Sequence, residues 1–120
     1  MAKSTVSLAD KFDLSLTHQL LTGSQAIVRL MLMQRAKDVA AGLNTAGYCT
    51  GYRGSPIAGL EAAMLRQQKL LKDNHIVFQS GLNEDLAATA LWGSQQAELR
   101  GDGKYDGVFG VWYGLSLIHI

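Results

Sequence analysis

The chain has 120 residues, of which 48% are hydrophobic and 18% charged, a balance that indicates one globular domain and excludes a disordered chain. The formal net charge is +1 and the charges are scattered, so the composition gives no reason to expect a nucleic-acid or membrane partner. A single cysteine, Cys49, excludes an internal disulfide and a metal site built from cysteines of this chain alone. With no signal-peptide core and no long apolar run, the sequence predicts a cytoplasmic protein.

The first segment in chain order is an N-terminal arm, residues 1–19, which is polar and irregular and which we expect other parts of the protein to order. Ser24 is the predicted N-cap of a helix that runs to about Ala41 and stops at Gly42, because glycine is favoured just past a helix end. The first half of this helix is apolar nearly all round. We therefore expect it to be buried on several sides.

Strands and helices alternate in the rest of the chain. The predicted elements are a strand at 46–52, a helix from the region of Pro56 to about Leu71, a strand at 75–79, a helix capped by Asn83 that runs to about Leu99, and a strand at 105–112. This alternation favours an α/β fold, in which a parallel sheet carries helices on both faces.

Two strand-to-helix loops carry unusual chemistry, at residues 51–56 and 81–85. In such sheets, ligands bind beyond the carboxyl ends of the strands, where glycines allow a close approach and helix starts offer free N–H groups. The same residues also suit plain turns and helix caps, so both interpretations stay open at this point. The glycine motifs of dinucleotide-binding and phosphate-binding loops are absent from the sequence.

Four separated blocks carry a family resemblance. They are LTGSQAIVRL at 21–30, GYRGSP at 51–56, GLNEDLAATA at 81–90 and YDGVFGVWYG at 105–114. In this order and spacing they resemble the amino-terminal pyrimidine-binding domain of the indolepyruvate ferredoxin oxidoreductase family, which comprises thiamine-diphosphate-dependent 2-oxoacid:ferredoxin oxidoreductases. Many relatives read Tyr-Pro-Gly-Thr-Pro at the first loop, where this chain has Arg53 for the first proline and Ser55 for the threonine.

The resemblance implies an enzyme that decarboxylates a 2-oxoacid oxidatively on thiamine diphosphate, forms an acyl-coenzyme A and passes the electrons to ferredoxin. It also implies a homo-oligomer, with Mg²⁺ and iron–sulfur clusters held by portions outside these residues. No residue of this chain is assigned to a metal. The 2-oxoacid, coenzyme A and ferredoxin are thus the implied partners.

The resemblance also assigns roles to residues of the two loops. Glu84 is implied as the catalytic carboxyl group beside N1′ of the aminopyrimidine ring, and burial in an apolar pocket would keep it protonated enough to donate. Tyr52, Gly54, Ser55 and Pro56 are implied as further cofactor-binding residues. Ser55, and after it Arg53, are the candidates for contact with the substrate. Asp85, about 100° away on the helix, is expected to act only in capping or in support of Glu84.

Residues 20–114 therefore form the predicted partial pyrimidine-binding domain, and residues 115–120 an atypical tail. Because the tail departs from the family's glycine-rich continuation, we expect a truncated or misassembled reading frame and no activity from the chain alone. Two alternatives remain: a non-catalytic α/β binding or regulatory module, and another thiamine-diphosphate enzyme, such as a decarboxylase or transketolase. Cluster-binding cysteines and a Mg²⁺-diphosphate motif in a downstream sequence would favour the oxidoreductase.

Overall fold

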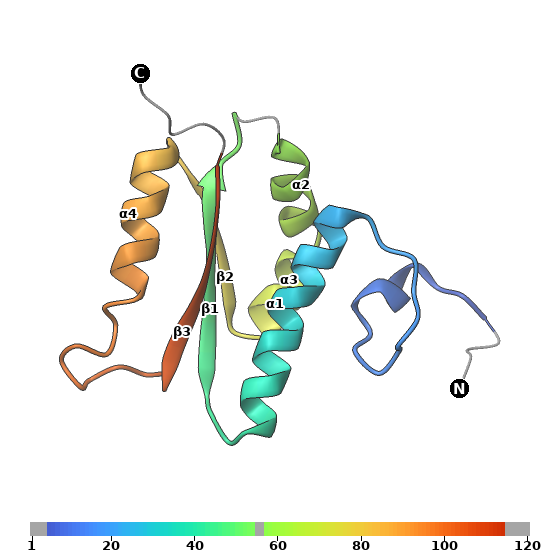
Figure 1. Ribbon diagram of the computed structural model, residues 1–120, viewed down its shortest axis with the longest axis horizontal. Helices are drawn as coiled ribbons and strands as arrows, with labels where there is room; N and C mark the ends of the chain where they lie inside the picture. Colours follow the sequence, from blue (N-terminus) through green and yellow to red (C-terminus); the bar gives the residue numbers. More distant parts are fainter. Residues whose placement is uncertain (1–4, 55–56, 115–120) are drawn as a thin grey trace.

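The computed structural model describes residues 5–54 and 57–114. In chain order its elements are the 3-10 helix η1 (Leu8–Phe12), α1 (Gly23–Ala40), β1 (Thr45–Tyr52), α2 (Ala58–Arg66), α3 (Gln68–Asp73), β2 (Ile76–Gly81), α4 (Glu84–Ser94) and β3 (Gly107–Tyr113). From α1 onward, helical segments and strands alternate as the sequence predicts, with α2 and α3 together forming the segment between β1 and β2. The described residues form an α/β fold (Figure 1).

The three strands form one parallel sheet in the order β2-β1-β3, so β1 is the central strand. Tyr48 of β1 lies opposite Val77 on one side and Gly110 on the other. Parallel neighbours need long crossover connections, and here each connection contains a helix. The predicted parallel sheet is confirmed, with strand ends displaced by one or two residues.

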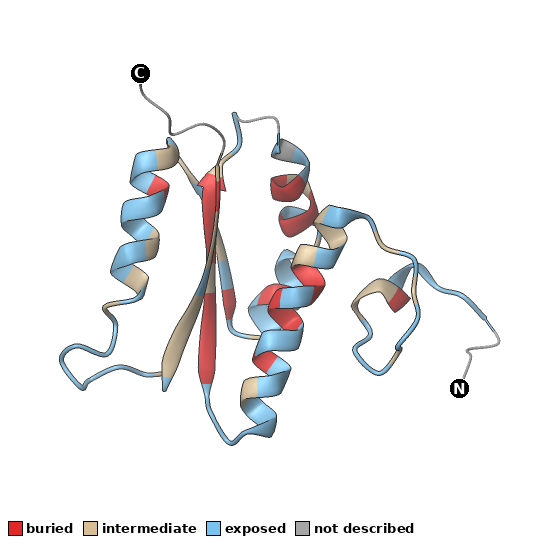
Figure 2. Cartoon of the chain, in the orientation of Figure 1, coloured by how far each residue is buried: buried red, intermediate tan, exposed pale blue. Residues whose placement is uncertain are grey.

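Helices cover both faces of the sheet, as predicted: α1, α2 and α3 lie on one face and α4 on the other (Figure 1). Successive strand side chains point to opposite faces, and Cys49 points toward α1, where it is fully buried with Val28 and Met31. Buried residues gather between the sheet and α1 and α2, whereas Ala87 is the buried residue of α4 (Figure 2). The core therefore lies on the α1–α3 side.

The ends of α1 are set by local hydrogen bonds. Thr22, two residues before the predicted cap Ser24, is the N-cap: its Oγ1 accepts from the Gln25 N–H at 3.3 Å, and Gln25 Oε1 accepts from the Thr22 N–H at 3.0 Å. This reciprocal pair is a capping box, which corrects the predicted start. At the other end, Gly42 has φ +83°, and the Leu43 N–H donates to the carbonyl oxygen of Asp38 at 2.9 Å. The predicted stop at Gly42 is confirmed.

The predicted second helix is two helices, which corrects the expectation of one continuous helix. Gln67, at φ −107° and ψ 19°, separates α2 from α3. The break lets α2 pack on α1 while α3 packs on β2, and it buries both Met64 and Leu71. Helix α4 is also shorter than predicted and ends at Ser94 instead of near Leu99.

Two apolar side chains of α1 contradict the expectation that its first half is buried on several sides. Leu30 is 60% exposed and Met33 is 49% exposed. In contrast, Val28, Met31 and Leu32 are buried against the sheet and α2. One face of α1 is therefore covered by the described residues, and the opposite face is open.

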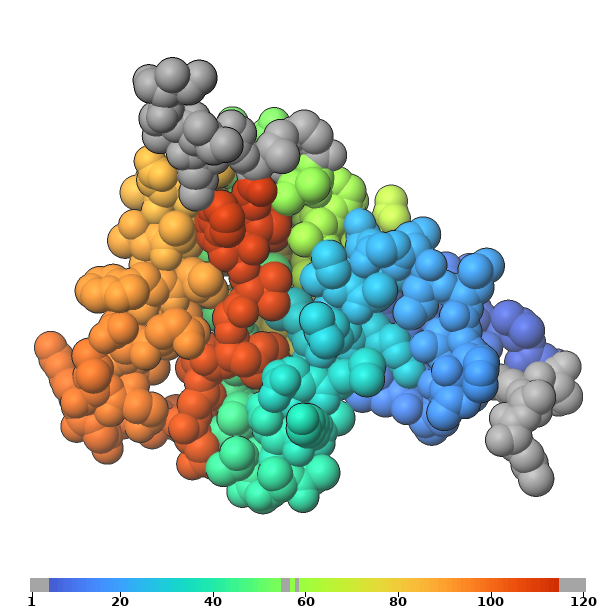
Figure 3. Space-filling model, in the orientation of Figure 1, coloured from blue at the N-terminus to red at the C-terminus, as the bar shows by residue number. Residues whose placement is uncertain are grey.

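The N-terminal arm is held by one buried side chain. Arg29 of α1 is 8% exposed, and its guanidinium donates to the carbonyl oxygens of Lys11 at 3.0 Å, Asp13 at 3.0 Å and Leu16 at 2.9 Å. The arm contains η1, so it is less irregular than predicted. In Figure 3 it forms a lobe beside α1 at one end of the molecule.

Candidate functional site

The two predicted loops leave the sheet at the same edge. Tyr52, the last residue of β1, lies opposite Gly81, the last residue of β2, and Gly51 lies opposite Tyr113 at the end of β3. All three strands therefore end together, beside the first turn of α4 (Figure 1). This is the edge at which α/β sheets bind ligands.

Glu84 is the first residue of α4 and is half-buried. Asn83 caps the helix, because its Oδ1 accepts from the Leu86 N–H at 2.8 Å. Within the described part of the chain, the Glu84 carboxylate makes no hydrogen bond or ion pair, while its backbone carbonyl accepts from Trp112 Nε1 at 3.3 Å. The carboxylate thus remains available to a ligand at the edge of the sheet.

Asp85 follows Glu84 in the first turn of α4 and is exposed. A carboxylate in this turn is stabilised by the positive end of the helix dipole. The cap itself is made by Asn83, so Asp85 contributes charge near the helix start and does not replace the cap.

The first loop is described in part. Tyr52 is half-buried, Arg53 and Gly54 are exposed, and Ser55 and Pro56 lie outside the described residues. A Cβ atom at Gly54 would overlap the ring of Tyr52. A side chain at this position would therefore require the Tyr52 ring to move.

Two further glycines bring the strands and α4 together at this edge. A Cβ atom at Gly51 would overlap the carbonyl oxygen and ring of Tyr113. A Cβ atom at Gly81 would lie 2.7 Å from the Cβ of Ala87 and 3.1 Å from the carbonyl oxygen of Gly51. Both positions lie close to a backbone carbonyl oxygen, which has little freedom to move. These glycines therefore fix the spacing on which the position of Glu84 depends.

Two buried polar residues at the same edge were not predicted from the sequence. Glu61, in the first turn of α2, is 7% exposed, and Tyr113, at the end of β3, is 5% exposed. Among the described residues, neither Glu61 Oε2 nor the Tyr113 hydroxyl has a hydrogen-bond partner. The signal for Glu61 was present: it lies four residues after Ile57 and beside Leu60, on the border of the apolar stripe that this helix presents to the core.

Burial and charge keep Tyr113 neutral. Its pKa is raised well above the usual value, chiefly by burial and further by the negative charge of Glu61 and by Cys49. The Cys49 thiol is fully buried, and its burial raises its pKa to about 12. Cys49 is therefore a neutral core residue, as predicted, and the Tyr113 hydroxyl retains its proton as a hydrogen-bond donor.

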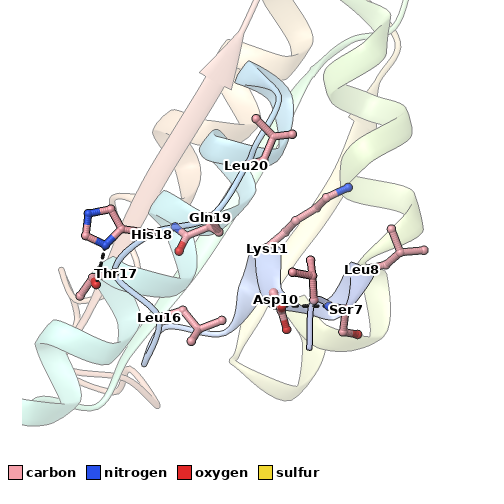
Figure 4. Close-up of a pocket in the computed structure, with 10 residues that line it drawn as sticks. Ser7, Leu8, Asp10, Lys11, Leu16, Thr17, His18, Gln19 and Leu20 are labelled. Carbon is pink, nitrogen blue, oxygen red and sulfur yellow. Dashed lines mark hydrogen bonds between the residues drawn. The ribbon is translucent and has the colours of Figure 1, made fainter. Parts of the chain in front are cut away.

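Two cavities lie away from this edge, at the N-terminal arm. One, of about 890 Å³, lies between η1 and the segment that leads to α1 (Figure 4). Leu8, at 84% exposure, and Leu20, at 91%, belong to its walls, so it is an open groove. The other, of about 530 Å³, lies between the arm and Gln67 and Leu70. Neither is lined by Tyr52, Arg53 or Glu84.

Comparisons with protein-family models, with curated proteins and with solved structures find no match to this chain. Among the described residues, no helix combines the length and the apolar character that crossing a membrane demands.

Proposed function

We propose that this chain supplies the pyrimidine-binding side of a thiamine-diphosphate-dependent oxidoreductase of the indolepyruvate type. The enzyme would decarboxylate a 2-oxoacid, form an acyl-coenzyme A and pass electrons to ferredoxin, as a cytoplasmic homo-oligomer. The proposal starts from the four sequence blocks that resemble that family. The strongest structural support comes from Glu84. It is the first residue of α4 and lies at the carboxyl edge, and its carboxylate makes no hydrogen bond within the described residues.

The arrangement of the four blocks supports this proposal. The blocks at 51–56, 81–90 and 105–114 include the carboxyl ends of β1, β2 and β3, which meet at one edge. The block at 21–30 begins α1, and Ser24 lies beside Gly59 at the start of α2, about 4.0 Å from the position of a Cβ there. Segments far apart in the sequence therefore converge near one end of the sheet.

The residues of the edge fit an aminopyrimidine ring. Such a ring needs a carboxyl group at one nitrogen, and Glu84 offers one that is not engaged by the described residues. Gly54 beside the Tyr52 ring and Gly81 beside Ala87 carry no side chain, so a ligand could approach the backbone of both loops closely. When bound, thiamine diphosphate would supply the electron sink for decarboxylation.

Each residue then has a defined task. Glu84 would hold a proton at its carboxyl group and share it with the pyrimidine nitrogen, while Asn83 orients the helix start through its cap. Tyr52 would flank the ring. Arg53 is exposed beside it, and its guanidinium suits the carboxylate of a 2-oxoacid. The roles proposed for Ser55 and Pro56 lie outside the described residues.

The pyrimidine contact can be tested on the 120-residue chain by NMR titration with 4-amino-2-methylpyrimidine. We expect the ligand to shift the amide signals of residues 81–87, and Glu84→Gln to weaken binding about tenfold, since a charge-assisted hydrogen bond is worth roughly 1.5–3 kcal/mol. Asp85→Asn is the matched control and should leave binding unchanged. Equal losses in the two variants would contradict the assignment of Glu84.

Turnover requires the diphosphate-binding and cluster-carrying portions, so it is tested in an enzyme that joins them to this chain. There, Glu84→Gln should lower 2-oxoacid-dependent viologen reduction by about 10²–10⁴-fold, the usual range for a general acid–base group. The 120-residue chain alone should show no such reduction. A Glu84→Gln enzyme with half the original rate would favour a capping role for Glu84 and the non-catalytic alternative.

A further inference from the structure

A second polar feature lies at the carboxyl edge, on the face of the sheet that carries α1, α2 and α3. The Tyr113 ring packs over Gly51 and belongs to the same core cluster as Cys49 and Leu60, so it points toward α2. Glu61 follows Leu60 in the first turn of α2. Helix α4, whose first residue is Glu84, lies on the opposite face of the sheet from α2 (Figure 1).

Within the described residues, the unpaired side-chain oxygens of Glu61 and Tyr113 lower the stability of the folded chain. Both side chains are more than nine-tenths buried, and each has a polar oxygen with no partner among the described residues. A buried polar group without a hydrogen bond destabilises the folded state, and a buried charge without a partner does so more strongly. A group that pairs with both oxygens would therefore be bound strongly for its size.

The chemistry of Glu61 and Tyr113 determines which kind of ligand group they would bind. The negative charge of Glu61 repels an anion and favours a cation. A hydrogen bond to a charged group is roughly twice as strong as one between neutral groups, so a charged donor is favoured over a neutral one. The hydroxyl of Tyr113 stays protonated, and its oxygen still accepts one hydrogen bond. A primary ammonium has three donors, enough for both oxygens.

We propose that Glu61 and Tyr113 form a binding subsite for the primary ammonium group of a small ligand at the carboxyl edge of the sheet. The Glu61 carboxylate neutralises the charge and accepts one N–H, and the Tyr113 hydroxyl oxygen accepts another. This subsite uses the opposite face of the sheet from Glu84 and does not rest on the proposed function.

The test compares two salts on the 120-residue chain at equal ionic strength. Methylammonium carries N–H donors, and tetramethylammonium carries the same charge without them. We expect methylammonium chloride to raise the midpoint of thermal unfolding in a saturable way, because a ligand that binds the folded state stabilises it. Tetramethylammonium chloride should not. Equal shifts with the two salts would overturn the proposal.

Variants then locate the subsite. Glu61→Gln should weaken methylammonium binding about tenfold or more, and Tyr113→Phe should weaken it several-fold. Glu98→Gln, at an exposed glutamate, is the matched control. Where a core variant does not fold, carbon NMR of the unsubstituted chain decides: methylammonium should shift the Glu61 carboxyl signal. A shift of the Glu84 signal in its place, or full binding by Glu61→Gln, would refute the subsite.

Discussion

Trp112 donates from its indole Nε1 to the backbone carbonyl oxygen of Glu84 at 3.3 Å, and so ties the end of β3 to the first turn of α4. The two residues are 28 positions apart in the chain. The bond joins an outer strand to the helix that covers its face, and it engages the backbone of Glu84 while leaving the carboxylate available. It therefore helps to hold Glu84 at the edge where the strands end.

Trp112→Phe should remove this bond while keeping most of the aromatic bulk. We expect a loss of about 0.5–1.5 kcal/mol in the free energy of unfolding, the usual worth of one hydrogen bond, measured by urea denaturation. Trp92→Phe is the control, since Trp92 is 66% exposed and should change stability by less than about 0.5 kcal/mol. Equal effects of the two substitutions would show that the indole bond contributes nothing.

Gly51→Ala should be strongly destabilising, because the added Cβ would meet the carbonyl oxygen and ring of Tyr113. Overpacking of this kind costs about 1–3 kcal/mol, and a backbone oxygen in a paired strand has little room to move. Gly23→Ala is the control: a Cβ there meets nothing within 4 Å, and alanine suits a helix better than glycine. The midpoint temperature of thermal unfolding should therefore fall strongly in Gly51→Ala and should not fall in Gly23→Ala.

Arg29→Met should release the N-terminal arm, because the guanidinium holds three of its carbonyl oxygens. Hydrogen bonds to charged groups are worth about 1.5–3 kcal/mol, so the arm should exchange its amide hydrogens and be cleaved by protease much faster. Arg29→Lys should be intermediate, since an ammonium lacks the planar fork of donors. Arg66→Met, at an exposed arginine, should leave the arm protected. An arm that stays protected in Arg29→Met would mean that other contacts hold it.

Alkaline pH should destabilise the chain through Cys49. Burial raises the pKa of this thiol from 9.0 to about 12, so above pH 9 the unfolded chain loses a proton that the folded chain keeps. The stability from the neutral thiol is present below pH 9 and is lost as the pH rises toward 12, at up to about 1.4 kcal/mol per pH unit.

Denaturant titrations at several pH values check this. Cys49→Ala should flatten the decline that begins near pH 9. Tyr113 should steepen the decline at higher pH, because its pKa is also raised, from 10.0. Tyr113→Phe should therefore keep the part of the slope that begins near pH 9. An unchanged profile in Cys49→Ala would mean that the thiol ionises without unfolding.

Local spacing in the sequence was enough to predict the parallel sheet with helices on both faces. Gly42 at the end of α1 and Asn83 at the start of α4 were likewise predictable, because their hydrogen bonds reach only a few residues along the chain. The predicted cap at Ser24 was wrong for an equally local reason. Thr22 and Gln25 form the reciprocal hydrogen bonds of a capping box, so the helix is capped two residues earlier.

The tertiary structure decided the features that depend on distant partners. The break at Gln67 arises because α2 packs on α1 whereas α3 packs on β2, and no local signal announces that change of partner. Leu30 and Met33 look like core residues, yet they are exposed because the described residues cover only one side of α1.

The same distinction between local sequence and tertiary structure applies to the candidate site. The sequence alone placed Glu84 at the start of a helix that follows a strand, because helix starts and strand ends are predicted from neighbouring residues. Only the fold brought Glu61 and Tyr113 to the same edge, on the face away from α4, and left their oxygens without partners among the described residues. Burial depends on the strand register and on which helix covers which face. These are set by hydrophobic contacts between segments that lie far apart in the chain.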